Sequence, residues 1–295
     1  MNVSVVIVTW NRCDDVCETL EKLKQLQPQP FEIIVVDNAS VDDTVSVIEY
    51  KYPNVKVIRS PVNVHCEEGN NIGARKAEGD IILFLDSDAH VEGDFISQIV
   101  KRFSSNKTLG ILEPRTVRPS DGKVLNEAEN WPKVNTFVAC VVAIRKDTIE
   151  KIGYRPGEYE IYGSEPDICI RTVEIGQKIM HDITMTGYHR ESAASRIPKK
   201  YYYYSTRNLT WVIWRHYPIL PAVYETVFLI IYHLYKSITH GALIHFFLGL
   251  VHGMKGVYEM ALKKRQPKKR YMEARIFPGI CDALRIVRKK LGEEK

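Results

Sequence analysis

Short apolar runs alternate with segments of helical spacing in the first third of the chain. The apolar runs are rich in β-branched residues and cover residues 3–8, 33–36, 55–58 and 81–85. Nearly continuous runs of this kind are typical of strands that are buried on both faces of a parallel sheet. The alternation predicts an α/β fold in which helices cover a doubly wound, mostly parallel sheet.

The segments between the predicted strands place apolar residues three or four positions apart, as amphipathic helices do. These residues are Val16, Leu20 and Leu23 in the first segment, and Ile96, Ile99, Val100 and Phe103 in a later one. Asp14 and Asp15 stand at the start of the first helix, where the helix dipole favours acidic side chains. We therefore expect a helix in each of these segments.

Doubly wound sheets bind their ligands beyond the carboxyl ends of the strands. Polar residues occupy these positions after three of the predicted strands: Thr9 and Asn11, then Asp37 and Asn38, then Asp86 and Asp88. The sequence thus predicts a polar binding site at this edge of the sheet.

The pattern changes where four consecutive tyrosines begin at Tyr201. Between residues 218 and 254 only Glu225 and Lys236 carry a formal charge. Two helices of roughly 16–18 residues fit this apolar stretch, which is close to the shortest length that crosses a bilayer. A C-terminal apolar helical appendage is therefore expected beside the α/β domain.

The chain has 295 residues, a length that suits one large domain with an appendage better than two equal domains. We expect the α/β domain over residues 1–205 and the helical region over residues 206–295. The six cysteines are scattered, which is typical of reduced thiols in a cytosolic setting. No basic leader precedes the first strand, so we expect no secretory signal.

The net charge of +5 is unevenly distributed along the chain. Residues 263–295 contain twelve Lys or Arg and four Asp or Glu, a local +8 that leaves −3 for the remainder. A basic tail on a mildly acidic body indicates an anionic partner of the tail. Because apolar helices precede it, we expect lipid headgroups as this partner and not nucleic acid.

Apolar helices, aromatic residues and a following basic cluster at residues 263–270 favour a segment in the cytoplasmic leaflet. This pattern predicts a peripheral or monotopic protein at the cytoplasmic face of the cell membrane, bound to anionic lipid. The alternative is a soluble helical subdomain or a homodimer interface, in which protein covers the apolar faces.

The most specific motif in the chain lies at residues 79–88, where a buried strand ends in Asp86-Ser87-Asp88. Two carboxylates one residue apart at a sheet edge can hold a divalent cation such as Mg²⁺ or Mn²⁺ against a diphosphate. An isolated Asp-x-Asp pair is a weak signal, because acidic loops after strands are common.

Three further segments accompany this motif in the order 5–12, 34–40 and 63–75. Together the four segments resemble the inverting glycosyltransferase family 2, and most of all its rhamnosyltransferase-like branch. The resemblance covers residues 1–205. It implies the GT-A fold, in which a nucleotide-binding α/β sheet joins an acceptor-binding half, and it implies a nucleotide-diphosphate sugar as donor.

The resemblance also implies which residues contact the donor. Thr9, Asn11 and Asp37 would line the nucleotide pocket, with the Asp37 carboxylate bonding the base. Asn63 and Arg75 would border the ribose and the diphosphate. A turn or capping role is the simpler explanation for Asp37.

The resemblance places the metal site at Asp86, Asp88 and His189. Asp86 would reach the ribose or the metal, and Asp88 would bind the metal itself. His189 falls where family members often have a histidine that completes the metal or diphosphate site, and neutral imidazole is a common ligand. A lone histidine is more often structural.

Residues 163–171 correspond to the family's segment that carries the general base. An acidic pair stands there in family members, and the second acid accepts the acceptor's proton. By position this acid is Glu165, while Ser164 replaces the first one. Asp167 is the other candidate base, although it stands four residues before Arg171 and could pair with it.

The resemblance implies an inverting glycosyltransferase, and we expect it to act on a hydroxyl of a glycan or a lipid-linked acceptor. A sugar nucleotidyltransferase is disfavoured because no glycine follows the first strand in Thr9-Trp10-Asn11-Arg12-Cys13. A dehydrogenase is disfavoured because the Gly-x-Gly-x-x-Gly motif is missing there. A membrane-docked scaffold that binds a nucleotide sugar without turnover is a further alternative.

Overall fold

The computed structural model describes residues 1–126, 137, 139–191 and 198–271, and its architecture is an eight-stranded sheet between helices. The strands are β1 (Val3–Thr9), β2 (Glu32–Asp37), β3 (Lys56–Arg59), β4 (Ile81–Asp86), β5 (Ala89–Val91), β6 (Leu109–Val117), β7 (Val141–Arg145) and β8 (Lys178–His189). Their order is β3-β2-β1-β4-β7-β6-β8-β5. The first four are parallel neighbours, while β7 pairs antiparallel with both β4 and β6.

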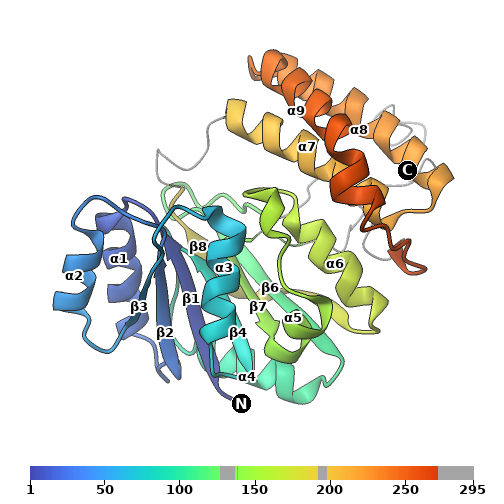
Figure 1. Cartoon of the computed structure of the whole chain (residues 1–295). Helices are drawn as coiled ribbons and strands as arrows, with labels where there is room; N and C mark the ends of the chain where they lie inside the picture. The colour runs from blue at the N-terminus through green and yellow to red at the C-terminus, as the bar shows by residue number, and fades with distance from the viewer. Residues whose placement is uncertain (127–136, 138, 192–197, 272–295) are drawn as a thin grey trace.

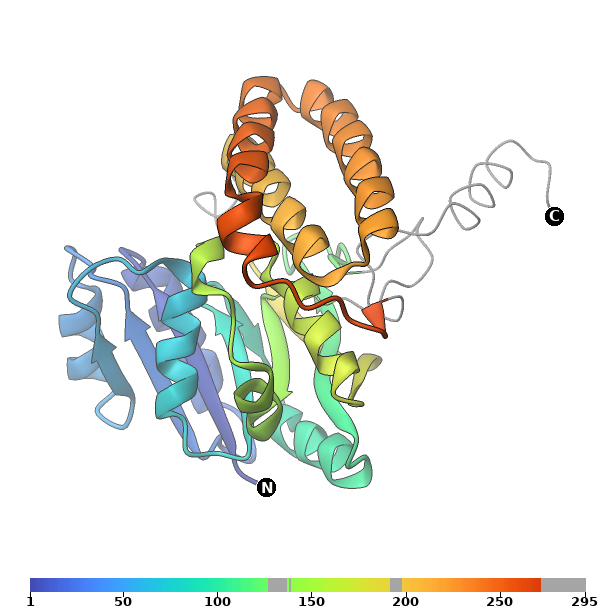
Figure 2. The ribbon, with the colours of Figure 1, turned by 45° about the vertical axis from the view of Figure 1, so that its right-hand side comes forward.

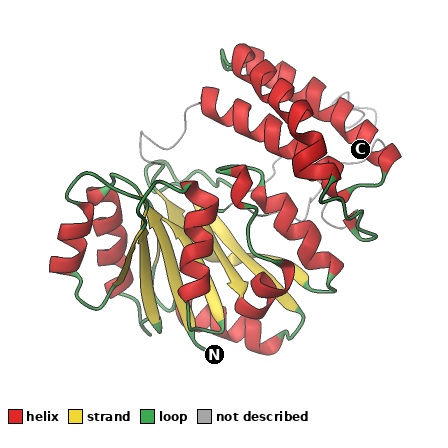
Figure 3. Cartoon of the chain, viewed as in Figure 1, coloured by secondary structure: helices red, strands yellow, loops and turns green. Residues whose placement is uncertain are grey.

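Six α-helices belong to the α/β domain (Figure 3). They are α1 (Cys13–Lys24), α2 (Thr44–Lys51), α3 (His65–Lys76), α4 (Phe95–Ser105), α5 (Lys146–Ile152) and α6 (Ser164–Glu174), with a short 3₁₀ helix η1 (Gly157–Tyr159) before α6. The predicted fold class, an α/β doubly wound sheet with a helical appendage, is confirmed.

The strands are apolar on both sides because each face of the sheet carries helices. Val5 and Ile7 of β1 belong to one buried cluster, together with residues of α1, α2 and α4. Val6, between them, belongs to a second cluster with residues of α3, α5 and α6. The alternation of side chains along a strand directs successive residues to these two cores.

The C-terminal region forms a helical layer above the carboxyl edge of the sheet (Figures 1 and 2). It consists of α7 (Pro198–His216), α8 (Ile219–Thr239), α9 (Leu243–Gly256) and a π-helical turn η2 (Val257–Leu262). The expected boundary between residues 205 and 206 falls inside α7, a continuous helix that packs on α6 as well as on α8 and α9. We refer to α7, α8, α9 and η2 as the appendage.

The apolar stretch forms the two expected helices, with 21 residues in α8 and 14 in α9. Neither these nor any other helix in the described part of the chain has the length and apolarity to cross a membrane. Five cysteines lie in the described residues, and all five are free thiols. Most of the basic tail, residues 272–295, lies outside the described residues, and Cys281 lies there too.

Candidate active site

The edge strand pair β5–β8 brings together three side chains that are far apart in sequence. Ala89 pairs with His189, so the histidine ring stands beside Asp88, 101 residues earlier in the chain. His189 Nε2 lies 3.1 Å from Asp88 Oδ1 and 3.8 Å from Asp86 Oδ2. One ligand atom from each residue lies within 4.8 Å of the others. We call Asp86, Asp88 and His189 the Asp–Asp–His cluster.

Burial and neighbouring charges both act on the Asp–Asp–His cluster, and burial raises the pKa of Asp86 although the charge of His189 opposes this. Burial lowers the pKa of His189, but the hydrogen bonds to Asp88 and Cys140 and the charge of Asp86 together outweigh this effect and raise the pKa to about 10. Arg12 Nη1 lies 3.4 Å from Asp88 Oδ2 and adds a second positive charge. Two carboxylates and an imidazole are a donor set that suits Mn²⁺ or Mg²⁺, so the residues fit a divalent ion.

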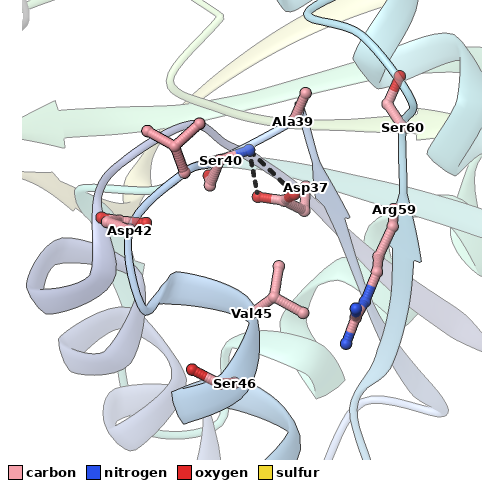
Figure 4. Close-up of a pocket in the computed structure, with 9 residues that line it drawn as sticks. Asp37, Ala39, Ser40, Asp42, Val45, Ser46, Arg59 and Ser60 are labelled. Atoms are coloured by element: carbon pink, nitrogen blue, oxygen red, sulfur yellow. Dashed lines mark hydrogen bonds between the residues drawn. The ribbon is translucent and has the colours of Figure 1, made fainter.

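A pocket of about 490 Å³ opens beside the carboxyl ends of β2 and β3 (Figure 4). Asp37 is buried at its wall, and its carboxylate accepts hydrogen bonds of 3.1 and 3.4 Å from the backbone N–H of Ser40. Arg59, which pairs in register with Asp37, and Ser60 line the pocket on the neighbouring strand and just beyond it. The pocket can take a planar polar group whose N–H donors face Asp37.

Thr9 and Asn11 follow β1 at the same edge. Thr9 is buried at the strand end and pairs in register with Asp37. Asn11 has a positive φ of 51°, and its side-chain oxygen accepts a 2.8 Å hydrogen bond from the N–H of Val41. Asn11 N–H also donates to Ser40 Oγ at 2.8 Å. Asn11 thereby fixes the loop that carries Ser40 and Val41 at the mouth of the pocket.

Asn63 and Arg75 lie at opposite ends of α3 and do not come together. Asn63 is exposed before the helix and accepts a 2.9 Å hydrogen bond from the N–H of His65. Arg75 stands in the last turn, about 15 Å along the axis from His65, because α3 runs away from the carboxyl edge. There it pairs with Glu68 at 2.7 Å and stacks on Tyr154. The Arg75 guanidinium thus reaches back toward Glu68 in the first turn, and Arg75 does not line the Asp37 pocket.

Glu165 lies in the first turn of α6, which begins after Gly163 in the left-handed conformation with φ 86°. Its side chain is half-buried and accepts a 3.1 Å hydrogen bond from the N–H of Gly163. Burial, and then the nearby carboxylate of Glu67, raise the pKa of Glu165 to about 7. A carboxylate with this proton affinity can take up a proton at neutral pH.

Asp167 has a different environment from Glu165. It is fully buried and accepts hydrogen bonds from Arg171 Nε at 2.6 Å and from Tyr159 Oη at 3.3 Å. His216 Nε2 and Arg215 Nη1, both of α7, lie 2.7 and 3.5 Å from Asp167 Oδ2. Although burial alone raises the pKa, Arg171 and His216 hold the pKa of Asp167 well below its usual range. These contacts join α6 to α7 and leave no room for a substrate.

The segment before Glu165 is held by α7 of the appendage. Asn208 Nδ2 donates to three backbone carbonyls, those of Tyr159, Ile161 and Tyr162, at 2.9, 3.0 and 2.7 Å. Glu160 and Tyr162 have positive φ values of 65° and 61°, which are unfavourable for residues with a Cβ. The amide of Asn208 stabilises this strained loop from one side.

Two buried residues at this edge have no role in the sequence motifs. Glu67 in α3 pairs with Arg155 at 3.3 Å, and the Arg155 guanidinium lies over the ring of Phe84. Burial, and then the carboxylates of Glu67, Asp86 and Glu165, raise the pKa of Cys66 well above its usual value. Glu165 and Asp86 therefore both lie within electrostatic range of this thiol. Neither Glu67 nor Arg155 has a sequence signal that predicts a buried pair, because they are 88 residues apart.

Solved structures with the same arrangement of strands and helices establish the fold family. Staphylococcus aureus TarS 1–349 in complex with UDP-GlcNAc superposes with a TM-score of 0.63 at 18% identity, covering 87% of this chain and 82% of that one. The mannosyltransferase PcManGT of Pyrobaculum calidifontis, in complex with GDP-Man and Mn²⁺, gives 0.60 at 16% identity, covering 100% and 88%. The described chain thus has the GT-A fold.

Curated relatives match part of the chain. An uncharacterized glycosyltransferase of Haemophilus influenzae is 30% identical over 125 residues, which are 42% of this chain and 41% of that protein. The uncharacterized glycosyltransferase YwdF of Bacillus subtilis is 30% identical over 109 residues, 36% of this chain and 39% of its own length. The chain spans less than half the length of these relatives.

The family model described as glycosyl transferase family 2 matches residues 4–169, more than half of the chain. This match includes the Asp37 pocket, Asp86, Asp88 and Glu165. The rhamnosyltransferase-like branch is not distinguished by any of these matches and stays a prediction. The chain belongs to glycosyl transferase family 2.

Proposed function

We propose that this protein transfers a sugar from a nucleotide-diphosphate donor to a hydroxyl acceptor, with inversion at the anomeric carbon. The observation that carries the proposal is the Asp–Asp–His cluster, whose ligand atoms lie within 4.8 Å of one another at the carboxyl edge. The Asp37 pocket and Glu165 stand at the same edge, where α/β sheets of this kind bind ligands.

The donor nucleotide occupies the Asp37 pocket in this proposal. Asp37 accepts hydrogen bonds from the base, and Thr9 and Asn11 shape the wall that the base and ribose contact. Asn63, exposed just before α3, is assigned to the ribose. TarS and PcManGT are described in complex with UDP-GlcNAc and GDP-Man, which supports a nucleotide sugar as ligand without naming the base. Arg75 has no part in this pocket.

Asp86, Asp88 and His189 would hold the divalent ion, Mg²⁺ or Mn²⁺, that the donor's diphosphate requires. When bound, the ion supplies Lewis-acid stabilisation of the negative charge that develops on the leaving diphosphate. Arg12 stands 3.4 Å from Asp88 and adds positive charge on the same side. PcManGT is described with Mn²⁺, which supports this choice of ion.

Glu165 is the proposed general base. The acceptor oxygen attacks the anomeric carbon while its proton passes to the Glu165 carboxylate, and the bond from that carbon to the diphosphate oxygen breaks on the opposite face. The pKa of about 7 leaves a substantial fraction of Glu165 ionised at neutral pH. Asp167 is assigned a structural role, because its oxygens are occupied by Arg171, His216 and Tyr159.

A panel of UDP-, GDP- and dTDP-sugars, each with and without Mn²⁺, tests the proposal. We expect one donor to raise the melting temperature in a Mn²⁺-dependent manner and to be consumed when acceptor glycans are added. A donor that binds but is neither hydrolysed nor transferred would favour the scaffold alternative. The presence of Ser164, where family members have the first acid of the pair, supports that alternative. Release of pyrophosphate from a nucleoside triphosphate and a sugar phosphate would identify a nucleotidyltransferase.

The proposed acceptor is a hydroxyl of a glycan, carried on a lipid. Support for the lipid comes from the appendage, which lies over the edge that holds Glu165 (Figures 1 and 2). The second alternative is a water-soluble acceptor together with a homodimer that forms through the appendage. Flotation of the protein with lipid vesicles distinguishes this alternative from a lipid-linked acceptor.

A further inference from the structure

Helix α8 has its polar side inside and its apolar side outside. Four polar residues face α7 and are buried, Glu225, Thr226, His233 and Ser237, with exposures of 4%, 9%, 2% and 0%. His233 Nδ1 lies 2.8 Å from Thr206 Oγ1 of α7, whereas the hydroxyls of Thr226 and Ser237 donate to carbonyl oxygens of α8 itself. The outer side consists of apolar residues at helical spacing: Leu220, Val223, Val227, Ile231, Tyr235 and Ile238.

Helix α9 continues the same arrangement beside α8. Its inner side is formed by Phe246 and by Gly249 and Gly253, which allow close approach to α7. A Cβ at Gly249 would collide with the carbonyl oxygen of Tyr203. Its outer residues are again apolar and exposed: Ile244, Phe247, Leu248, Val251 and Met254. We refer to the outer residues of both helices as the α8–α9 face.

The α8–α9 face is unfavourable in water. Leu220 is 82% exposed and Ile244 is 71% exposed, and the face runs along the whole of α8. A soluble monomer rarely presents contiguous apolar surface of this extent, and the usual explanation is a binding surface. Rotating α8 would not remove the problem, because it would expose the core residues Ala222 and Leu229, which lie among the buried polar residues of the helix.

Charge distinguishes a bilayer from a second copy of this chain as the occupant. Helices α8 and α9 carry Lys236 and Lys255, whereas Lys264, after η2, pairs with Glu158, and the Arg265 guanidinium donates to the carbonyl oxygens of Trp214 and Tyr217. Glu225 is buried, and Glu259 already pairs with Lys263 at 2.7 Å. A second copy would bring Lys236 and Lys255 of both chains together without an exposed acid on either helix to pair with them, whereas anionic headgroups complement them. Since no described helix is able to span a membrane, the fitting geometry is a helix pair lying in the plane of the leaflet.

We propose that the α8–α9 face docks on the surface of an anionic bilayer, with the apolar side chains among the acyl chains and the basic residues at the headgroups. The appendage then holds the carboxyl edge of the sheet close to the membrane surface. If the protein transfers a sugar as proposed above, this position restricts the acceptor to a lipid-linked hydroxyl that is presented from the membrane surface.

The test is flotation of the full-length protein with phosphatidylcholine vesicles that contain or lack phosphatidylglycerol. We expect flotation with anionic vesicles that is weakened but not abolished by high salt, because salt screens the lysines and not the apolar contacts. The triple variant Val227→Glu, Ile231→Glu, Tyr235→Glu should reduce the vesicle-bound fraction roughly tenfold or more. These residues are exposed, so the fold should tolerate the change.

Two single variants are matched controls. Tyr50→Glu on α2 and Ile183→Glu on β8 each place an acid on an exposed apolar residue of the α/β domain, and both should float like the wild type. Melting curves verify that all variants are folded. Donor binding, measured by thermal shift without vesicles, should be equal in the triple variant and the wild type.

Three results would overturn the docking proposal. They are a wild type that ignores anionic vesicles at low salt, a triple variant that floats as well as the wild type, and a dimer that the triple variant converts to a monomer. The last would identify the face as a subunit interface. If the wild type bound none of the nucleotide sugars, the glycosyl-transfer proposal would be refuted instead, independently of the flotation result.

Discussion

His216 Nε2 of α7 lies 2.7 Å from the carboxylate of Asp167 in α6, so the appendage and the helix that carries Glu165 share one buried ion-pair network. Burial lowers the pKa of His216, and the neutral ring donates its Nε2 proton to the ionised Asp167. Arg171 and Arg215 neutralise the same carboxylate from other sides. The network fixes the direction of α6 relative to the appendage.

Replacing Asp167 should therefore act on stability before it acts on catalysis. Asp167→Asn leaves the two arginines without their buried counter-charge, and we expect a loss of about 3 kcal/mol in the free energy of unfolding. Urea unfolding measures this loss, and the exposed Asp147→Asn on α5 serves as control. A variant that keeps its stability but loses transfer as completely as a Glu165 variant would return Asp167 to the list of candidate bases.

Replacing Glu165 should act on transfer alone. Glu165→Gln keeps the shape of the side chain and removes its proton affinity, so turnover should fall by roughly 10²-fold or more while donor binding survives. Steady-state kinetics and a donor titration separate the two effects. If binding and turnover fell together, Glu165 would be a structural residue.

The pH dependence of transfer follows from the same group. Because the base must be ionised, turnover of the wild type should rise as the pH increases through about 7 and then level off. Glu165→Gln should lose this limb of the profile. A wild-type profile that is flat between pH 5.5 and 8.5, a range of roughly 1.5 pH units on each side of the pKa, would contradict the assignment.

Stability should change with pH in the opposite sense. Burial raises the pKa of Glu165 above its value in the unfolded chain, so the folded protein binds more protons between the two values and loses stability as pH rises through them. Glu165→Gln has no charge to bury. It should melt above the wild type at pH 8, and the difference should shrink at pH 5, which differential scanning calorimetry can follow.

The metal assignment can be tested without an acceptor. Asp88→Ala removes one carboxylate of the Asp–Asp–His cluster, and we expect Mn²⁺-dependent binding of a nucleoside diphosphate to disappear while the melting curve stays cooperative. Isothermal calorimetry with Mn²⁺ alone and with the nucleotide measures both parts. Asp121→Ala, an exposed acid outside the site, is the control, and unchanged binding by Asp88→Ala would refute the assignment.

Asn208 is expected to position Glu165 from a distance. Asn208→Ala removes three hydrogen bonds from the strained loop at Tyr159–Tyr162, so turnover should fall while the affinity for the donor changes little. Ser205→Ala, on the same helix, removes only a bond to its own helix and should have no such effect. Equal losses in both variants would mean that α7 is merely destabilised.

The sheet could be predicted from sequence because its strands are buried on both faces. Val3 to Val8 and Ile81 to Leu85 show this as continuous apolar runs, and the observed strands extend each by a single residue. Helix α1 was predictable for a similar reason, since Val16, Leu20 and Leu23 all face one core. Local patterns of this kind depend on neighbours in sequence.

Contacts between distant segments were harder to foresee. Asp167 has His216 and Arg215 as partners, some fifty residues later, and no local pattern predicts them. Arg75 follows a motif on α3, but the direction of the helix takes it away from the carboxyl edge. The expected domain boundary likewise falls inside α7. This helix packs on several elements, α6 as well as α8 and α9, but its backbone is continuous, and no local pattern predicts this.

The pairing of Ala89 with His189 has a consequence for assembly of the sheet. Because β8 is held in place by its longer pairing with β6, a slip of one residue in the short β5–β8 pairing would shift β5, set Ala89 opposite Tyr188 and separate Asp88 from His189. An ion that binds only the native alignment would favour that alignment by mass action. Removing the ion with a chelator should then increase amide hydrogen exchange in β5 and β8 more than in the parallel strands. The bound cation would in this way select the native strand register.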